Sequence, residues 1–322
     1  MTTVKLNAKR IILFILIFVM LFCCFDYVSY HSSTKGYVHK ILSLDGSRYG
    51  YDEVAPVLDV MGSDDGTTKL ILGDSVANQM LEGFMGNDED FLIWPVNRAI
   101  TFAGQYILIK EYLAAHPNAE DVYVIVYSGS LASDVDSELA YQYLAMPFII
   151  NGYEDELDEL VMGKLKDRFG GFFIRPEVLD YINESGVNRS IYLNAVSAIN
   201  SRRFNNDTDD VVSDITADYL KKIYDMCTEA GVNIHLVSTP LCDTETRREE
   251  CDRIRIFFEE SGLDEMYPDY CNGFIFKDSE YFLEDEVHFK PEYKNREIFE
   301  PMLREMIGMD SKLAGLTKIL CE

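Results

Sequence analysis

Short apolar runs alternate with longer amphipathic segments along the chain from residue 69 onward. Apolar runs bounded by polar or turn residues predict buried strands at Lys69–Leu72, Phe91–Val96, Asp121–Tyr127, Asn233–Ser238 and, more weakly, Gly273–Phe276. Apolar positions at helical spacing predict helices at Val76–Phe84, Ala103–Ala115, Val211–Ala230, Arg247–Glu260 and Glu292–Ile307. Strands that alternate with helices in this way form a parallel sheet covered on both faces, so the pattern predicts an α/β domain.

The alternation is interrupted between residues 131 and 210, which we interpret as an insertion into that domain. Helical spacing recurs there at Ser137–Leu144 and Glu154–Lys166, and the polar run at 201–210 predicts a loop. Residues 31–66 are polar and rich in Gly, Ser and Asp in places, which is typical of a tether. The folded domain is therefore expected to span residues 67–322.

The N-terminus has the pattern of a membrane signal. A basic tail, residues 1–10, carries Lys5, Lys9 and Arg10, and the apolar run Ile11–Phe25 follows it directly. A cleaved signal peptide needs small residues at its cleavage site, and FDYVSYHSS has no such pattern. We therefore favour an uncleaved single-pass anchor at residues 11–30, which leaves the tail in the cytoplasm and the domain outside the cell membrane.

The net charge of the chain argues against one class of binding partner, the nucleic acids. The 322 residues carry a formal net charge of -26. Such a surface repels phosphate backbones, so no nucleic-acid partner is expected.

Seven cysteines allow two interpretations. Outside the cytoplasm disulfides are permitted, and Cys242 with Cys251 is the pair closest in sequence beyond the apolar run. The alternative is that several of these thiols are free and buried. No C-x-x-C pair occurs, so a structural zinc site has little support.

A candidate nucleophile follows the first predicted strand. Gly73-Asp74-Ser75 forms a strand-to-helix turn, which presents a serine beside the unpaired N–H groups of a helix start. Small polar residues also cap helices routinely, so the tripeptide alone is a weak motif.

A candidate base precedes the last predicted helix. His288 lies in the polar loop LEDEVHFKPEY with Asp285 three residues earlier, and a carboxylate there can hold the imidazole in one tautomer. The other histidines have structural explanations: His31 and His39 lie in the tether, His116 ends a helix and His235 sits within an apolar strand. The alternative for His288 is an ordinary surface residue of the loop.

The segment ILGDSVANQM together with Asp285-Glu286-Val287-His288 resembles the SGNH/GDSL hydrolase superfamily. The resemblance implies a flavodoxin-like three-layer α/β/α sandwich in which Ser75 is the nucleophile, Asp285 the orienting acid and His288 the base. It also implies an oxyanion hole formed by the N–H groups of Ser75 and Gly104, shaped by Asn97. No metal or organic cofactor is implied.

The third block of the chain departs from that family. Typical esterases carry G-x-N-D after the third strand, with the Asn as an oxyanion donor, whereas this chain has Ser128-Gly129-Ser130. The remaining candidates are Ser128, Ser130 or backbone N–H groups alone, and one such donor is worth on the order of 3 kcal/mol.

The anchor and the altered block together resemble the membrane-anchored branch of the superfamily, which includes the D-alanyl transfer protein of teichoic acid and the alginate-type O-acetyltransferases. That resemblance implies acyl transfer to a cell-surface carbohydrate or polymer, with a multispanning membrane acyltransferase as a partner. A carbohydrate esterase with the same triad, or a catalytically weak glycan-binding protein on the same fold, are the alternatives.

For two further sets of residues, the sequence allows more than one role. Tyr141, Tyr143 and Tyr153 in the insertion are compatible with a sugar cleft or with core packing. Asn183, Asn188 and Asn206 begin Asn-x-Ser/Thr triplets, which accept glycans only in a eukaryotic secretory pathway.

Overall fold

The computed structural model describes residues 50–81, 86–88, 91–135, 139–184 and 210–290, together with 12–18, 20, 21 and 24. The predicted cytoplasmic tail, most of the tether and the predicted helix Glu292–Ile307 lie outside the described residues. In the described part of the chain, no helix is both long enough and apolar enough to cross a membrane. The anchor therefore stays a prediction from the sequence.

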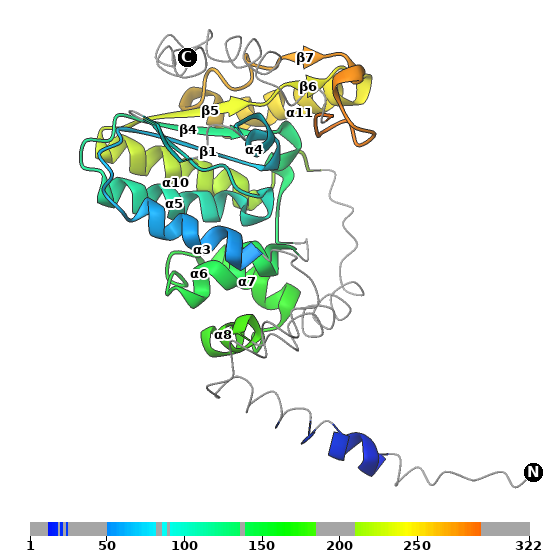
Figure 1. Cartoon of the computed structure of the whole chain (residues 1–322). Coiled ribbons are helices and arrows are strands. Elements are labelled where there is room, and N and C mark those ends of the chain that lie inside the picture. Colours follow the sequence, from blue (N-terminus) through cyan, green and yellow to red (C-terminus); the bar gives the residue numbers. More distant parts are fainter. Residues whose placement is uncertain are drawn as a thin grey trace, which may run out of the picture.

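In the described residues, the domain is built on a five-stranded sheet of spatial order β2-β3-β1-β4-β5 (Figure 1). Its strands are β1 (Lys69–Gly73), β2 (Gly86–Asp88), β3 (Phe91–Ile93), β4 (Asp121–Val126) and β5 (Asn233–Ser238). Four of them, β1, β3, β4 and β5, are parallel, while β2 pairs antiparallel with β3. The predicted α/β class and its parallel sheet are confirmed, and only the short β2 was not anticipated.

Two strands form a separate small sheet beside the main one. Here β6 (Leu241–Cys242) pairs in parallel with β7 (Phe276–Lys277). The weakly predicted last strand is thus a two-residue element at the end of the expected range, and it belongs to this second sheet.

Helices cover both faces of the main sheet (Figure 1). The described helices, including those of the insertion, are α3 (Gly50–Met61), α4 (Ser75–Leu81), α5 (Thr101–Ala115), α6 (Met146–Ile150), α7 (Glu159–Phe169), α8 (Pro176–Glu184), α10 (Asp214–Ala230), α11 (Glu245–Ser261) and α12 (Leu263–Met266). Short 3-10 segments are η1 (Arg98–Ile100), η2 (Ser128–Ala132) and η4 (Ser279–Tyr281), and η3 (Tyr141–Ala145) is a π-helix.

The central strands β1, β3 and β4 are apolar along most of their length because each of their faces meets a different hydrophobic core. From β4, Val122 and Val124 point into the core shared with α3, α5 and α10. Tyr123 and Ile125 alternate with these valines and point the other way, into the second core, which is shared with α4 and the Cys251 region of α11. Parallel strands buried on both faces show this continuous apolar pattern, which is why the sequence predicts them well.

The predicted tether is shorter than expected. Residues 50–61 form α3, whose Val54, Val57, Leu58 and Met61 are buried against the core. The spacing of these residues is helical, but Pro56 and the flanking polar residues resemble a loop. Burial of that apolar face against the domain outweighs the local cost of the proline.

The described part of the insertion, residues 131–135, 139–184 and 210, contains several helices and packs onto α3 and α5, on the side of the molecule away from the second core (Figure 1). Tyr141 is 1% exposed, and its hydroxyl donates to the carbonyl of Phe173 at 2.7 Å. Tyr143 is buried and Tyr153 packs edge-on against Phe148. The core interpretation is confirmed for Tyr141 and Tyr143, for which the sugar-cleft interpretation is wrong, while Tyr153 is partly buried at the edge of the core.

The cysteines within the described residues are free. Cys227, Cys242, Cys251 and Cys271 are buried thiols, so the suggested Cys242–Cys251 disulfide is absent. Burial raises the pKa of Cys271 to about 11 and that of Cys251 to about 12, which keeps both thiols protonated and unreactive near neutral pH. Of the three Asn-x-Ser/Thr residues, Asn183 is buried in α8, and Asn188 and Asn206 lie outside the described residues.

We predict that Gly73→Ala destabilises the protein by about 3 kcal/mol, near the upper end of overpacking effects. An added Cβ would lie 2.3 Å from the Ile125 carbonyl oxygen and 2.6 Å from the Ala77 Cβ, and neither can move without displacing backbone. The matched control is Gly163→Ala in α7, where a Cβ meets nothing within 4 Å. That change should stabilise by about 0.5–1 kcal/mol. Urea unfolding of both variants measures the difference, and equal midpoints would contradict the predicted close approach.

Candidate active site

The candidate site lies at the carboxyl ends of β1 and β4. The chain leaves β1 toward β3 on one side, and β4 lies on the other side of β1. Ligand sites in open α/β sheets form where the strand order reverses in this way, because the loops there diverge and leave a crevice. Ser75 follows β1 and Ser128 follows β4, so two of the sequence-predicted site residues meet at this edge.

Asp74 joins the turns after these two strands. Its side chain is buried, and Oδ1 accepts hydrogen bonds from the N–H groups of Val76 at 2.9 Å and Ala77 at 3.1 Å. Oδ2 accepts from the Tyr127 N–H at 2.7 Å and from the Ser130 hydroxyl at 2.5 Å. The carboxylate therefore caps α4 and holds the turn after β4 in place, which fixes where Ser75 is presented.

The predicted triad is assembled. The Ser75 Oγ lies 3.3 Å from His288 Nε2, and His288 Nδ1 lies 2.7 Å from Asp285 Oδ2. When Nδ1–H donates to the carboxylate, Nε2 carries the lone pair that can accept the serine proton. Residues 213 positions apart thus form the contact that a serine nucleophile requires.

Asp285 is held by its own loop. Its Oδ1 accepts from the N–H groups of Val287 at 3.0 Å and His288 at 2.9 Å. Partial burial by itself raises the pKa of this carboxyl, but the hydrogen bonds from His288 and Val287 outweigh it, so the pKa is lowered from its ordinary value. The group is therefore ionised at neutral pH and can stabilise an imidazolium.

Two buried phenylalanines seat the histidine loop. Phe282 and Phe289 form an isolated antiparallel bridge, and their rings stack at 4.9 Å within the second core. The Leu283 N–H donates to the His288 carbonyl at 2.7 Å. Glu286, at the tip between Asp285 and His288, has a φ of 56°, which is unfavourable for a side chain other than glycine. Such strain concentrates at functional sites, which fits the role expected of this loop.

Asn97 lies at the same edge as Ser75. The Val96 N–H donates to the Gly73 carbonyl at 2.9 Å, so the chain leaves the side of β1 just before Asn97. The Asn97 side chain accepts from the Ala99 N–H at 2.9 Å and caps η1. This bond makes Asn97 the cap of η1, and its part in shaping an oxyanion hole stays a prediction.

The serines after β4 have other partners. Ser130 donates its hydroxyl proton to Asp74, and its N–H donates to the Tyr127 carbonyl at 2.8 Å. The Ser128 hydroxyl lies 3.4 Å from Glu250 Oε1 and donates to it. The Ser130 hydroxyl is thus engaged by Asp74 and the Ser128 hydroxyl is directed toward α11, and a part for either in an oxyanion hole stays a prediction.

Gly129, between these two serines, is required by the packing of a neighbouring ring. A Cβ on Gly129 would lie 2.6 Å from Cε1 of Tyr127, so the tyrosine ring folds over the turn. The Arg247 guanidinium lies over the same ring at 4.7 Å and pairs with Glu250. These contacts join α11 to the turn after β4.

Gly104 is held inside α5. A Cβ there would lie 2.9 Å from both Ile100 Cβ and Phe148 Cε2, so the glycine allows α6 to approach α5. This contact explains the glycine by packing, and its part in an oxyanion hole remains a prediction.

Thr101 is a residue that sequence reasoning missed. It is buried and carries the turn from η1 into α5 at φ 52° and ψ -179°, a region that glycine almost alone adopts. The sequence gives no sign of this turn conformation at Thr101, because threonine rarely adopts a positive φ.

The other described histidines lie away from the triad. His116 ends α5, stacks on Tyr112 at 4.1 Å and pairs with Asp65 at 3.0 Å. His235 stacks on Tyr123 at 4.5 Å and contacts Asp121, the first residue of β4. The structural interpretation of both is confirmed.

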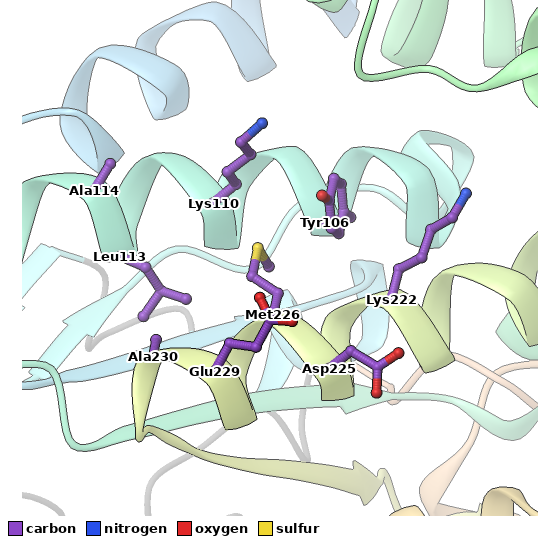
Figure 2. A pocket seen from close by; sticks show the side chains of 9 residues that line it. All are labelled: Tyr106, Lys110, Leu113, Ala114, Lys222, Asp225, Met226, Glu229 and Ala230. Carbon is purple, nitrogen blue, oxygen red and sulfur yellow. The ribbon is translucent and has the colours of Figure 1, made fainter.

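A cavity of about 480 Å³ lies elsewhere, between the outer surfaces of α5 and α10 (Figure 2). Lys110 and Lys222 lie on its lining, together with Tyr106, Asp225 and Glu229. The bond to Glu156 raises the pKa of Lys110, and bonds to Asp158 and Asp218 raise that of Lys222 despite its partial burial. Both amines therefore stay protonated and are not nucleophiles, and none of the triad residues lines this cavity.

Comparison of the chain with protein-family models, with curated proteins and with solved structures finds no match. The family resemblance therefore rests on the motifs of the chain itself. Among the described residues, no group of three or more His, Cys, Asp or Glu side chains is placed to hold a metal ion.

We predict that Asp74→Asn destabilises the protein by about 2–3 kcal/mol, because the new amide would direct a donor at the Tyr127 N–H and leave a buried polar group unpaired. Ser130→Ala removes one donor and keeps the carboxylate, and it should cost about 1 kcal/mol. Thermal and urea unfolding rank the two variants. An Asn variant no less stable than Ser130→Ala would contradict the role assigned to Asp74.

We predict that Asp285 stabilises the fold only above acid pH. Because its folded pKa lies below the ordinary value of 3.8, its contribution is present above that value and is lost as the pH falls through the folded pKa. Asp285→Asn should therefore be less stable than the parent protein at pH 6, and the difference should shrink below pH 3.8. Urea unfolding across this range checks it, with Glu284→Gln as an exposed neighbouring control. A stability difference between Asp285→Asn and the parent protein that does not change with pH would contradict the prediction.

Proposed function

We propose that this protein is an extracytoplasmic serine-dependent acyl-transfer enzyme, an O-acyltransferase or esterase, with Ser75, His288 and Asp285 as its catalytic triad. The observation that carries the proposal is the chain of contacts from Ser75 Oγ to His288 Nε2 at 3.3 Å and from His288 Nδ1 to Asp285 Oδ2 at 2.7 Å. A separation of 3.3 Å is slightly long for a reacting pair, as is usual when no substrate is bound.

The fold supports assignment to the SGNH hydrolase type. Numbered along the chain, the parallel strands lie in the order second, first, third, fourth, which is the flavodoxin-like order as far as these four strands extend. Helices on both faces give the three layers that this fold requires. The serine after the first strand and the Asp-x-x-His before the C-terminal segment occupy the positions expected from the resemblance.

The proposed reaction proceeds through an acyl-serine. His288 Nε2 takes the Ser75 proton while Oγ bonds to the carbonyl carbon of an ester or thioester, and the carbonyl pair moves onto oxygen. Collapse of this intermediate breaks the bond to the leaving group, which departs with the proton from His288. Water or a carbohydrate hydroxyl then gives its proton to His288 and attacks the acyl group, and Ser75 regains its hydrogen.

The Ser75 N–H is the proposed donor to the oxyanion. It is at the first position of α4, where a helix leaves its N–H groups without intrahelical partners. The second donor proposed for the hole is the Gly104 N–H, and the occupied side chains of Ser128 and Ser130 add none. This incomplete set favours one alternative function, a catalytically weak glycan-binding or envelope-assembly protein that keeps the same fold.

The cellular setting is proposed from the sequence. The basic tail and the apolar run at 11–25 support a single-pass anchor, with the N-terminus in the cytoplasm and the catalytic domain outside. We propose a cell-envelope polysaccharide or related polymer as the acceptor. A multispanning membrane acyltransferase is the proposed partner that supplies the acyl group.

The proposal predicts covalent labelling of one serine. Full-length protein treated with a fluorophosphonate probe should carry a single adduct on Ser75, located by peptide mass spectrometry. Ser75→Ala should carry none. His288→Ala should react roughly 10²- to 10⁴-fold more slowly, because the serine loses its general base.

Two outcomes separate the alternatives. Absence of any adduct, in folded protein that binds a glycan, would support the binding protein and contradict the enzyme. Labelled protein that releases acyl groups to water alone indicates an esterase, and product that forms only with added polysaccharide indicates a transferase.

A further inference from the structure

Gln79 lies one helical turn after the candidate nucleophile. Residues four apart share a face of a helix, so Gln79 and Ser75 both project from α4 toward the histidine loop. The Gln79 Oε1 accepts a hydrogen bond from the N–H of Phe289 at 3.2 Å. Phe289 follows His288 directly in the chain, so this bond joins the helix of the nucleophile to the backbone beside the base.

The histidine loop has few directional contacts with α4. The bonds from the Leu283 N–H to the His288 carbonyl and from the Val287 and His288 N–H groups to the Asp285 carboxylate are internal to residues 281–290. They determine the shape of the loop and leave its position open. The buried rings of Phe282 and Phe289 attach the loop to the core, and hydrophobic contact is non-directional.

Within the described residues, the Ser75–His288 contact and the Gln79–Phe289 bond are the two hydrogen bonds between this loop and α4. One contact alone would allow the loop to pivot about the serine. A second bond one turn further along the helix sets both the distance and the direction of the imidazole.

We propose that Gln79 is a positioning residue of the triad, which holds the His288 loop at the distance from α4 that lets Nε2 reach Ser75 Oγ. This inference rests on the proposed acyl-transfer function and extends it to a residue outside the triad. Reactivity depends steeply on such placement, since an error of about 1 Å can cost on the order of 10²-fold in rate.

A purely structural role would be different. Gln79 would then satisfy the Phe289 N–H, and its loss would lower stability with no separate effect on the chemistry. The two roles are separated by comparing the maximal rate of serine modification with the affinity for the probe in folded variants.

Three single variants of the full-length protein make the test. Gln79→Met keeps the length of the side chain and removes the acceptor, and Gln79→Glu keeps an acceptor oxygen. Asn78→Met places the same side chain at the exposed neighbouring position of α4. The measurement is the rate of Ser75 modification by a fluorophosphonate over a range of probe concentrations, which gives the maximal rate and the half-saturating concentration separately.

The expected result is a fall of roughly 10- to 100-fold in the maximal rate for Gln79→Met, with the half-saturating concentration unchanged. Gln79→Glu should recover most of that rate, and Asn78→Met should match the parent protein. Equal maximal rates for Gln79→Met and Asn78→Met would overturn the positioning role while leaving the triad itself intact.

Amide hydrogen exchange of residues 281–290 provides a readout that needs no activity. Gln79→Met should exchange faster in this segment than Asn78→Met, because the Phe289 N–H loses its acceptor. If the parent protein shows no labelling, the proposed enzymatic function fails, and the exchange data still judge Gln79. Unchanged exchange would overturn the inference in that case also.

Discussion

The site depends on the buried carboxylate of Asp74, which has no ion-pair partner among the residues that the structure describes. Removing a charge from water costs several kcal/mol, and this cost is offset only when the group is fully hydrogen-bonded. Asp74 meets that condition with four donors, three from the backbone and one from Ser130. Because the donors come from the turns after β1 and β4, the carboxylate can be satisfied only when both turns are correctly placed. Stability of the fold and placement of Ser75 are therefore the same requirement.

The need to hydrogen-bond Asp74 also explains the residues Ser128-Gly129-Ser130 in the turn after β4. The Ser130 hydroxyl is required by Asp74, and Gly129 leaves room for the Tyr127 ring, which Arg247 of α11 covers. The turn after β4 is thus built to hold the carboxylate and to receive α11. In the proposed reaction, the donors to the oxyanion are therefore backbone N–H groups, among them that of Ser75 at the start of α4.

The base is held by a different kind of interaction. Phe282 and Phe289 anchor the His288 loop by burial, and hydrogen bonds within the loop set its shape. Hydrophobic burial secures the loop without directing it, so the geometry of the triad relies on the few polar contacts to α4. Among the described residues, the non-glycine positions at positive φ are Thr101, at the turn into α5, and Glu286, at the tip of this loop, where the surrounding packing holds them.

The sequence by itself predicted the parallel strands, most of the helices of the sheet domain and the three residues of the proposed triad, which the structure places in contact. The central strands are apolar on both faces, which a sequence shows directly. Gly73-Asp74-Ser75 and Asp285-x-x-His288 are each short local patterns that can be found without knowing the fold. Tertiary structure alone decided that α3 belongs to the core despite Pro56, that Tyr141 and Tyr143 are interior residues, and that the serines after β4 serve Asp74 and Glu250. The partners in these contacts lie far apart in the chain, so no local pattern announces them.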